Sequence, residues 1–263
     1  MNLPDRNTRK CHSHGIGVHL FFCLCLAPGI AYAETEAFKP ELLGDIGLGG
    51  YFAGNIIRSN SNTINVLPYL DFEYGRVFAR VDTLGIKTLK LGYGHLELVG
   101  RISQDGFSAN AANLSGIGKR ETSLPLGVGT LQVMPLGGVM VNAFHDVNRS
   151  QGDLLEVIYG GQVDLPRVTF YPLLGAEYLS KKYVRYYYGI SSLDAASSQY
   201  AAYQPGDSVN GIIGLIAEIK LTDEYYLNCN IRRKLLGNSI QLSPIVNQRY
   251  LDTGYLSLSY RFK

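Results

Sequence analysis

The stretch Tyr255-Leu256-Ser257-Leu258-Ser259-Tyr260-Arg261-Phe262 lies one residue before the end of the sequence and alternates strictly between two kinds of side chain. Leucines and aromatic residues occupy its even positions, whereas tyrosine, serines and arginine occupy its odd positions. Successive side chains of a β-strand point to opposite faces. The period of two therefore predicts a strand with one apolar and one polar face.

The same period recurs along the chain toward the N-terminus. In the preceding segment, Leu227 and Ile231 share one face, while Asn228 and Arg232 share the other. Such segments match the length that a tilted strand needs to cross a bilayer. The pattern predicts an all-β fold, an antiparallel transmembrane β-barrel of about 12 strands, with about 10 to 12 compatible with the pattern. The predicted strands cover residues 43–53, 64–74, 76–86, 92–102, 124–133, 136–146, 154–162, 168–178, 183–190, 209–221, 224–234 and 251–262.

A soluble antiparallel sandwich would show the same alternation, so a second feature has to separate the two folds. A barrel in lipid turns its apolar face outward and encloses its polar face in the lumen. Charges repeat on the polar faces of many predicted strands, which suits a wet lumen and favours the barrel. The predicted lumen-facing residues are His95, Glu97, Arg101, Glu218, Lys220, Arg232 and Arg261.

The N-terminus has the order of features typical of a secretory leader. Basic residues at positions 6, 9 and 10 precede an apolar stretch over 16–30, and the small-x-small site Ala31-Tyr32-Ala33 follows. The apolar stretch contains His19, Pro28 and Gly29 and is too short for a spanning helix. We expect a signal peptide over 1–33, cleavage after Ala33, and a barrel over 34–263 in the outer membrane of a Gram-negative cell.

Removal of the leader changes the charge and the cysteine content. The whole chain has 24 basic and 22 acidic residues; the leader takes three basic and one acidic, which leaves 21 of each. No basic surplus remains to indicate a nucleic-acid partner. Cys229 is the one cysteine left after the leader, and His95 and His145 are the two histidines. We therefore expect no internal disulfide, metal site or cofactor.

The longer connections predict which end of the barrel faces outward. Bacterial barrels keep both termini in the periplasm and carry their long loops outside. The predicted strands then place 54–63, 191–208 and 235–250 outside, as this rule expects. The long stretch 103–123 falls on the periplasmic side instead. Either the strand count is off by one in the middle of the chain, or the barrel has a long periplasmic connection.

The C-terminal third resembles the MipA/OmpV family, the MltA-interacting outer-membrane proteins. A weaker likeness surrounds Gly116 and the segment 119–123, whereas Lys263 departs from the terminal aromatic residue usual in such barrels. The order and spacing of the pieces carry the resemblance. They are Tyr187-Tyr188-Gly189-Ile190, Tyr203-Gln204-Pro205-Gly206, Leu221-Thr222-Asp223-Glu224, Leu235-Leu236-Gly237-Asn238, Ser243-Pro244-Ile245-Val246 and Ser259-Tyr260-Arg261-Phe262.

The resemblance implies a non-enzymatic scaffold in outer-membrane lipid. Its partners would be a murein hydrolase, the lytic transglycosylase, and a murein synthase, the bifunctional penicillin-binding protein. The partner-binding candidates are Lys119, Arg120 and Glu121, provided that 103–123 is periplasmic. The family also includes osmolarity-linked and adhesive surface proteins, and family likeness alone does not decide among these roles.

Two further functions remain open from the residues themselves. Twelve strands could enclose a porin-like diffusion channel for small solutes, with the predicted luminal charges along its wall. An enzyme would need a base beside a nucleophile, and His95 with Glu97 on one face, or His145 next to Asp146, could supply half of such a dyad. No serine or cysteine is placed beside either pair by a motif.

Overall fold

The computed structural model describes residues 38, 40–58, 62–103, 105–107 and 114–262. The chain divides into two units, Met1–Glu34 and Thr35–Lys263, and the described residues all belong to the second. The predicted signal peptide, its cleavage site and Lys263 lie outside the described residues. Among the described residues, no helix is long and apolar enough to span a membrane.

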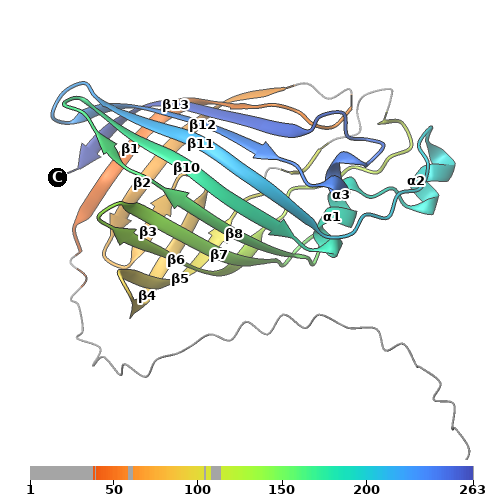
Figure 1. Cartoon of the computed structure of the whole chain (residues 1–263), viewed down its shortest axis with the longest axis horizontal. Helices are drawn as coiled ribbons and strands as arrows, with labels where there is room; N and C mark the ends of the chain where they lie inside the picture. The colour runs from red at the N-terminus through yellow and green to blue at the C-terminus, as the bar shows by residue number, and fades with distance from the viewer. Residues whose placement is uncertain (1–37, 39, 59–61, 104, 108–113, 263) are drawn as a thin grey trace, which may run out of the picture. The chain divides into compact units, whose positions relative to one another are not determined.

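The described chain folds into a closed antiparallel β-barrel of twelve strands, as predicted (Figure 1). The barrel closes where β1 pairs with β13 and where β10 pairs with β11. β8 and β9 both pair with β10 and together form one interrupted wall strand. The strands are β1 Leu42–Ala53, β2 Thr63–Tyr74, β3 Val77–Arg80, β4 Thr83–Leu91, β5 Gly94–Arg101, β6 Pro125–Met134, β7 Gly137–Asp146, β8 Asp153–Gly160, β9 Val163–Asp164, β10 Val168–Leu179, β11 Ser208–Lys220, β12 Tyr225–Leu235 and β13 Tyr250–Phe262.

The wall is apolar outside and polar inside, which is the reverse of a soluble sandwich. In β13 the Leu256 side chain is 54% exposed, whereas the neighbouring Ser257 is 1% exposed. Tyr260 also faces outward and makes edge contacts with Tyr225 and Phe262, at ring-centroid distances of 5.6 and 5.3 Å. An aromatic cluster of this kind suits a membrane–water interface. The period of two therefore separates an outward apolar face from an inward polar face, as predicted for a membrane barrel.

Two errors in the predicted strands compensate for each other. The segment 76–86 is not one strand but the hairpin β3–β4, which turns at Val81 and Asp82. Val81 adopts a φ of 53°, a conformation rare for a β-branched residue, so no glycine or asparagine marked the turn. The segment 183–190 is not a strand but mostly the helix α1, Lys181–Tyr188. The total of twelve is unchanged.

The extra hairpin moves one loop to the other end of the barrel. Each added strand reverses the end at which the next connection lies, so 102–124 lies at the end of the other long connections, 54–62, 180–207 and 236–249. Contacts between these loops bear this out, because Ser103 hydrogen-bonds Tyr183 and Ile57 bridges to Val246. Of the two alternatives, the first holds: the strand count was off by one in the middle of the chain, and the connection 102–124 lies at the same end as the other long loops. We call this end the loop end and the other the turn end.

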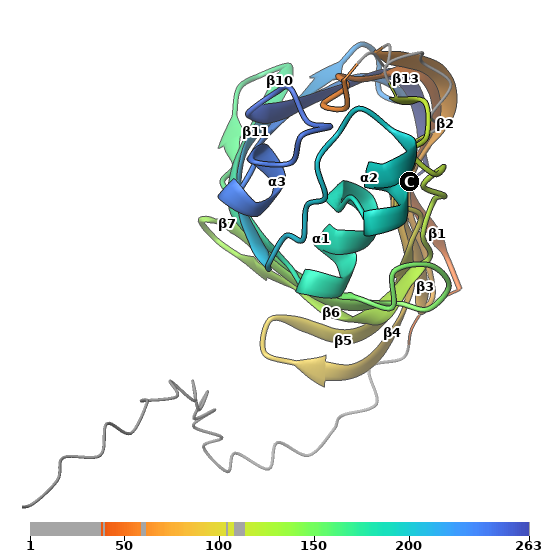
Figure 2. The same cartoon turned by 90° about the vertical axis from the view of Figure 1, so that its right-hand side faces the viewer.

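The long loops fold into an apolar cap at the loop end. The cap contains α1 and the short helices α2, Ser192–Ser197, and α3, Asn238–Gln241. Figure 2 looks onto this end and shows the helices within the outline of the strands. Buried side chains from different loops meet there and exclude water. They include Ile57, Phe107, Leu114, Tyr183, Val184, Tyr187, Ile190, Ile240, Ile245 and Val246.

Candidate functional site

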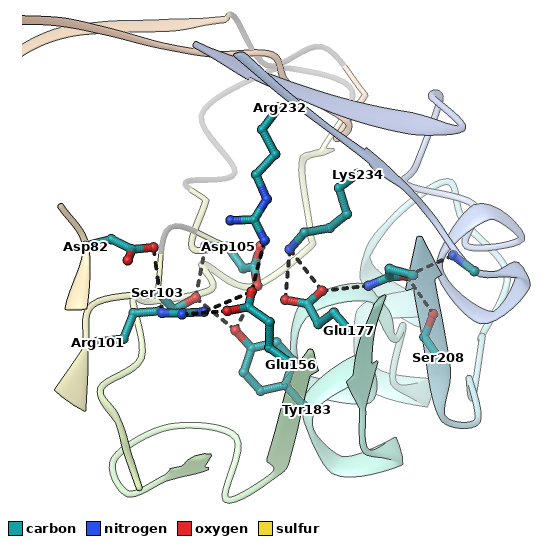
Figure 3. Close-up of polar contacts among 12 residues, drawn as sticks. Asp82, Arg101, Ser103, Asp105, Glu156, Glu177, Tyr183, Ser208, Arg232 and Lys234 are labelled. Carbon is teal, nitrogen blue, oxygen red and sulfur yellow. Dashed lines mark hydrogen bonds and ion pairs between the residues drawn. The ribbon is translucent and has the colours of Figure 1, made fainter. Parts of the chain in front are cut away.

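Beneath the cap, Glu156 of β8 joins two arginines from distant strands (Figure 3). Its Oε1 lies 2.8 Å from Nη2 of Arg101 in β5, and its Oε2 lies 2.9 Å from Nη2 of Arg232 in β12. Two strands stand between β5 and β8, and two more between β8 and β12. Glu156 is buried, and its two carboxylate oxygens each face one guanidinium, which compensates the cost of burying its charge. The trio therefore crosses the lumen from wall to wall.

A second buried carboxylate, Glu177 of β10, organises the lumen beside this trio. Lys234 Nζ lies 2.9 Å from its Oε2, and the Asn210 amide donates to the same oxygen at 2.8 Å. Asn210 in turn accepts hydrogen bonds from the Gly237 amide at 2.8 Å and from the Ser208 hydroxyl at 3.1 Å. Gly237 begins α3, so this network ties the wall to the cap.

Tyr183 connects the cap to the loop 102–124. Its hydroxyl lies 2.8 Å from the Ser103 hydroxyl and donates to Asp105 Oδ2 at 2.7 Å. Burial first, and then the Asp105 carboxylate, raise the pKa of Tyr183 well above its ordinary value. The hydroxyl therefore keeps its proton and remains a donor. This contact fixes α1 against the loop 102–124.

Toward the turn end, further ion pairs fill the lumen. Arg261 lies 2.6 Å from Asp45 Oδ1, and it also pairs with Glu218. Arg80 makes two hydrogen bonds to the carboxylate of Glu97, at 2.7 and 2.8 Å. Paired guanidinium and carboxylate groups of this geometry are strong and directional. Polar contacts thus line the lumen along much of its length.

The seven predicted lumen residues do not all join these networks. Glu97, Arg101, Glu218, Arg232 and Arg261 do, as described above. Lys220 lies instead at the turn end, half-exposed, 2.7 Å from Asp223. His95 is half-buried, and its ring centroid lies 5.2 Å from that of Phe38, which precedes β1.

The partner-binding candidates of the loop 102–124 point in different directions. Lys119 is exposed and lies 3.6 Å from Glu121, which also pairs with Arg149. Arg120 turns inward and lies 3.2 Å from Asp194 of α2. All of them belong to the loop end, so the argument that placed them in the periplasm no longer holds.

His145 and Asp146 do not face each other, because they point to opposite sides of β7. His145 faces outward and pairs through Nδ1 with Asp153 at 2.7 Å. Asp146 faces inward and accepts hydrogen bonds from the Ser150 hydroxyl and backbone. In the described part of the chain, no three acidic, histidine or cysteine side chains gather as a metal site. Around His145 and Asp146 the structure thus shows an ion pair and hydrogen bonds.

The sequence reasoning missed Glu156 and Glu177, the two acids on which the loop-end networks depend. Each is a single charge on the inward face of a strand, next to apolar residues such as Leu154 and Leu179. A lone charge at an inward position was the sequence feature that could have identified each acid as part of a lumen network. Their charged partners could not be found in the same way, because Arg101, Arg232 and Lys234 lie on strands that do not neighbour those of the two acids.

The comparison with protein families agrees with this architecture. A family model described as "MltA-interacting protein MipA" matches residues 46–262, which is nearly the whole barrel. The chain belongs to the MipA family. The resemblance identified in the C-terminal third therefore extends over all the described strands from β2 to β13 and over most of β1.

Curated relatives place this MipA-family chain among outer-membrane barrels. One is "Putative outer membrane protein YiaT" of Escherichia coli (strain K12), 23% identical over 82% of this chain and 90% of the relative. Another is "MltA-interacting protein" of the same strain, 27% identical over 36% of this chain and 38% of the relative. Together with the closed barrel, these relatives support an outer-membrane location.

Proposed function

We propose that this barrel is a non-enzymatic scaffold that holds murein-remodelling enzymes at the periplasmic face of the outer membrane. The observation that carries the proposal is the family match over 46–262, since a relative is named for its interaction with MltA. The enzymes would be a lytic transglycosylase and a bifunctional penicillin-binding protein, as the family resemblance implies. A scaffold needs a rigid exposed surface rather than a reactive site.

The lumen favours a scaffold over a diffusion channel. Glu156 with its two arginines spans the interior, and the cap occupies the loop end. A solute would have to break buried ion pairs and displace apolar side chains to pass. Breaking one buried pair typically costs about 3 to 5 kcal/mol.

The periplasmic surface of this scaffold would be the turn end, because barrels keep their short turns in the periplasm. Two neighbouring turns there present apolar side chains: Tyr93 is 75% exposed and Leu136 is 82% exposed. Gln132 holds the first turn through the Tyr93 amide at 2.8 Å, and Tyr159 holds the second through the Leu136 carbonyl at 2.7 Å. Rigid aromatic and aliphatic anchors of this kind suit a docking surface.

Capture of purified MltA by the full barrel in detergent micelles tests this proposal. We expect native barrel to retain the enzyme and the double variant Tyr93→Ala, Leu136→Ser to retain at least about tenfold less, since two anchors are lost. Leu193→Ser is the matched control, because Leu193 is 79% exposed in α2 at the loop end. Full retention by the double variant would rule out this surface. Failure of native barrel to retain MltA would overturn the scaffold itself.

A further inference from the structure

The cap contains an open cavity of about 300 Å³. Its lining residues do not belong to the lumen networks described above. It lies between the loop 102–124, the end of α1, α2 and the segment that follows α2. Its volume is at the lower end of the range for small-molecule sites, which suits a ligand of monosaccharide size. The lining includes Arg120, Arg185, Tyr186, Ser191, Asp194 and Gln204.

The acid of this cavity is already fully engaged. Asp194 accepts hydrogen bonds from the Ser191 hydroxyl at 2.9 Å and from the Gly118 amide at 3.3 Å. Burial acts to raise the pKa of Asp194, but these hydrogen bonds and Arg120 together hold it below its ordinary value. Asp194 therefore stays ionised, and its charge is balanced by Arg120 at 3.2 Å.

Arg185 contributes one uncompensated positive charge to the lining of the cavity. Its Nε donates to the Pro205 carbonyl at 3.3 Å, which fixes the side chain. No carboxylate in the described part of the chain pairs with its guanidinium, and its terminal nitrogens have no hydrogen-bond partner there. With Arg120 and Asp194 cancelling each other, the lining favours a monoanion over a doubly charged phosphate. A guanidinium presents two parallel donors, which match a carboxylate.

Beyond the charge, the lining suits a ligand that carries hydroxyl groups. The Gln204 side chain is exposed and makes no hydrogen bond within the described residues, so its amide can both donate and accept. The Tyr186 hydroxyl accepts from the Glu121 amide at 3.2 Å, and its O–H donates to no acceptor among the described residues. Its ring is held edge-on by Tyr187, with centroids 4.9 Å apart. We propose that this cavity binds a uronic acid, a monocarboxylate sugar, through Arg185.

Saturation-transfer NMR on the full barrel in detergent micelles tests the site. Sodium glucuronate is the free-acid probe, and a hyaluronan tetrasaccharide carries the same acid within a polysaccharide. Glucose and glucose 6-phosphate are the neutral and doubly charged comparisons. We expect saturable binding of a uronate probe, none of glucose, and weaker binding of the phosphate. Tighter binding of glucuronate would indicate a free uronic acid as the ligand, and tighter binding of the tetrasaccharide would indicate a polysaccharide.

Two variants on α1 attribute the binding to Arg185. Arg185→Gln should weaken uronate binding about tenfold or more, because a charge-assisted contact is lost. Lys182→Gln removes an exposed charge from the same helix outside the cavity and should leave binding unchanged. Both positions are exposed, and heat-modifiable gel migration verifies that each variant is folded. Absence of saturable uronate binding, a preference for the phosphate, or equal binding by Arg185→Gln would overturn the proposal.

Discussion

Glu156 shows how a single residue can link distant parts of a barrel. It lies between Leu154 and Ile158 on the inward face of β8, yet it pairs with arginines from β5 and β12. The alternation of side chains predicted that Arg101 and Arg232 face the lumen. It could not pair them with Glu156, because contacts across a lumen depend on strand number and stagger rather than on sequence distance.

Replacement of Glu156 by glutamine should destabilise the barrel strongly. The variant keeps the shape of the side chain but leaves Arg232 without its acid and Arg101 with only the longer pair to Asp82, at 3.6 Å. We expect a loss of about 3 kcal/mol in the free energy of unfolding, in line with breaking a buried pair. The chain contains no tryptophan, so urea unfolding in lipid vesicles is best followed by the heat-modifiable gel shift.

Glu224→Gln is the matched control for this substitution. Glu224 lies exposed in the turn between β11 and β12, where a surface change should alter stability by less than about 0.5 kcal/mol. Equal unfolding midpoints for the two variants would mean that the cross-lumen trio contributes little.

At the scale of the elements, ten of the twelve predicted segments correspond to wall strands, and the other two fail for physical reasons. The segment 183–190 is rich in tyrosine, which favours a strand. Its buried residues, Tyr183, Val184, Tyr187 and Tyr188, instead follow the spacing of a helix face. The turn of the hairpin at Val81 has no glycine, asparagine or proline, and only Asp82 marks it. The two errors change the strand count by one in opposite directions, so the total holds, and the missed hairpin alone misplaced the loop 102–124.

The glycines of β6 show where strand pairing leaves no room for a side chain. A Cβ added at Gly127 would lie 1.9 Å from the Ala143 carbonyl oxygen on β7, whereas one at Gly138 would meet nothing closer than 3.5 Å. The pairing of β6 with β7 gives the reason, because Gly127 lies directly opposite Phe144 of the partner strand.

Gly127→Ala should therefore lower the free energy of unfolding by about 2 kcal/mol, because a backbone oxygen must move. Gly138→Ala, on the partner strand, should change it by less than about 0.5 kcal/mol. Urea titration by the same gel shift compares them. A similar loss in both variants would show that alanine is disfavoured in these strands for a reason other than contact.

At the scale of the whole molecule, the apolar side chains face outward and the polar ones inward, the opposite of a soluble protein, and this arrangement suits a membrane. The apolar face that alternation predicts would be buried in a soluble sandwich, but here it is exposed around a closed wall. The polar face forms ion pairs inside, and the loops form a dry cap at one end. The family resemblance suggested the scaffold role, while the cap cavity and the braced turns became visible only in three dimensions.

Spin labels along β13 test this arrangement most directly. Single cysteines at 256, 257, 258 and 259, introduced with Cys229→Ser and reconstituted in lipid vesicles, report access to oxygen from lipid and to a water-soluble nickel reagent. Labels at 256 and 258 should show high oxygen access, and those at 257 and 259 should not. Equal oxygen access at all four positions, or lipid access at 257 and 259 in place of 256 and 258, would contradict a barrel with its leucines in lipid.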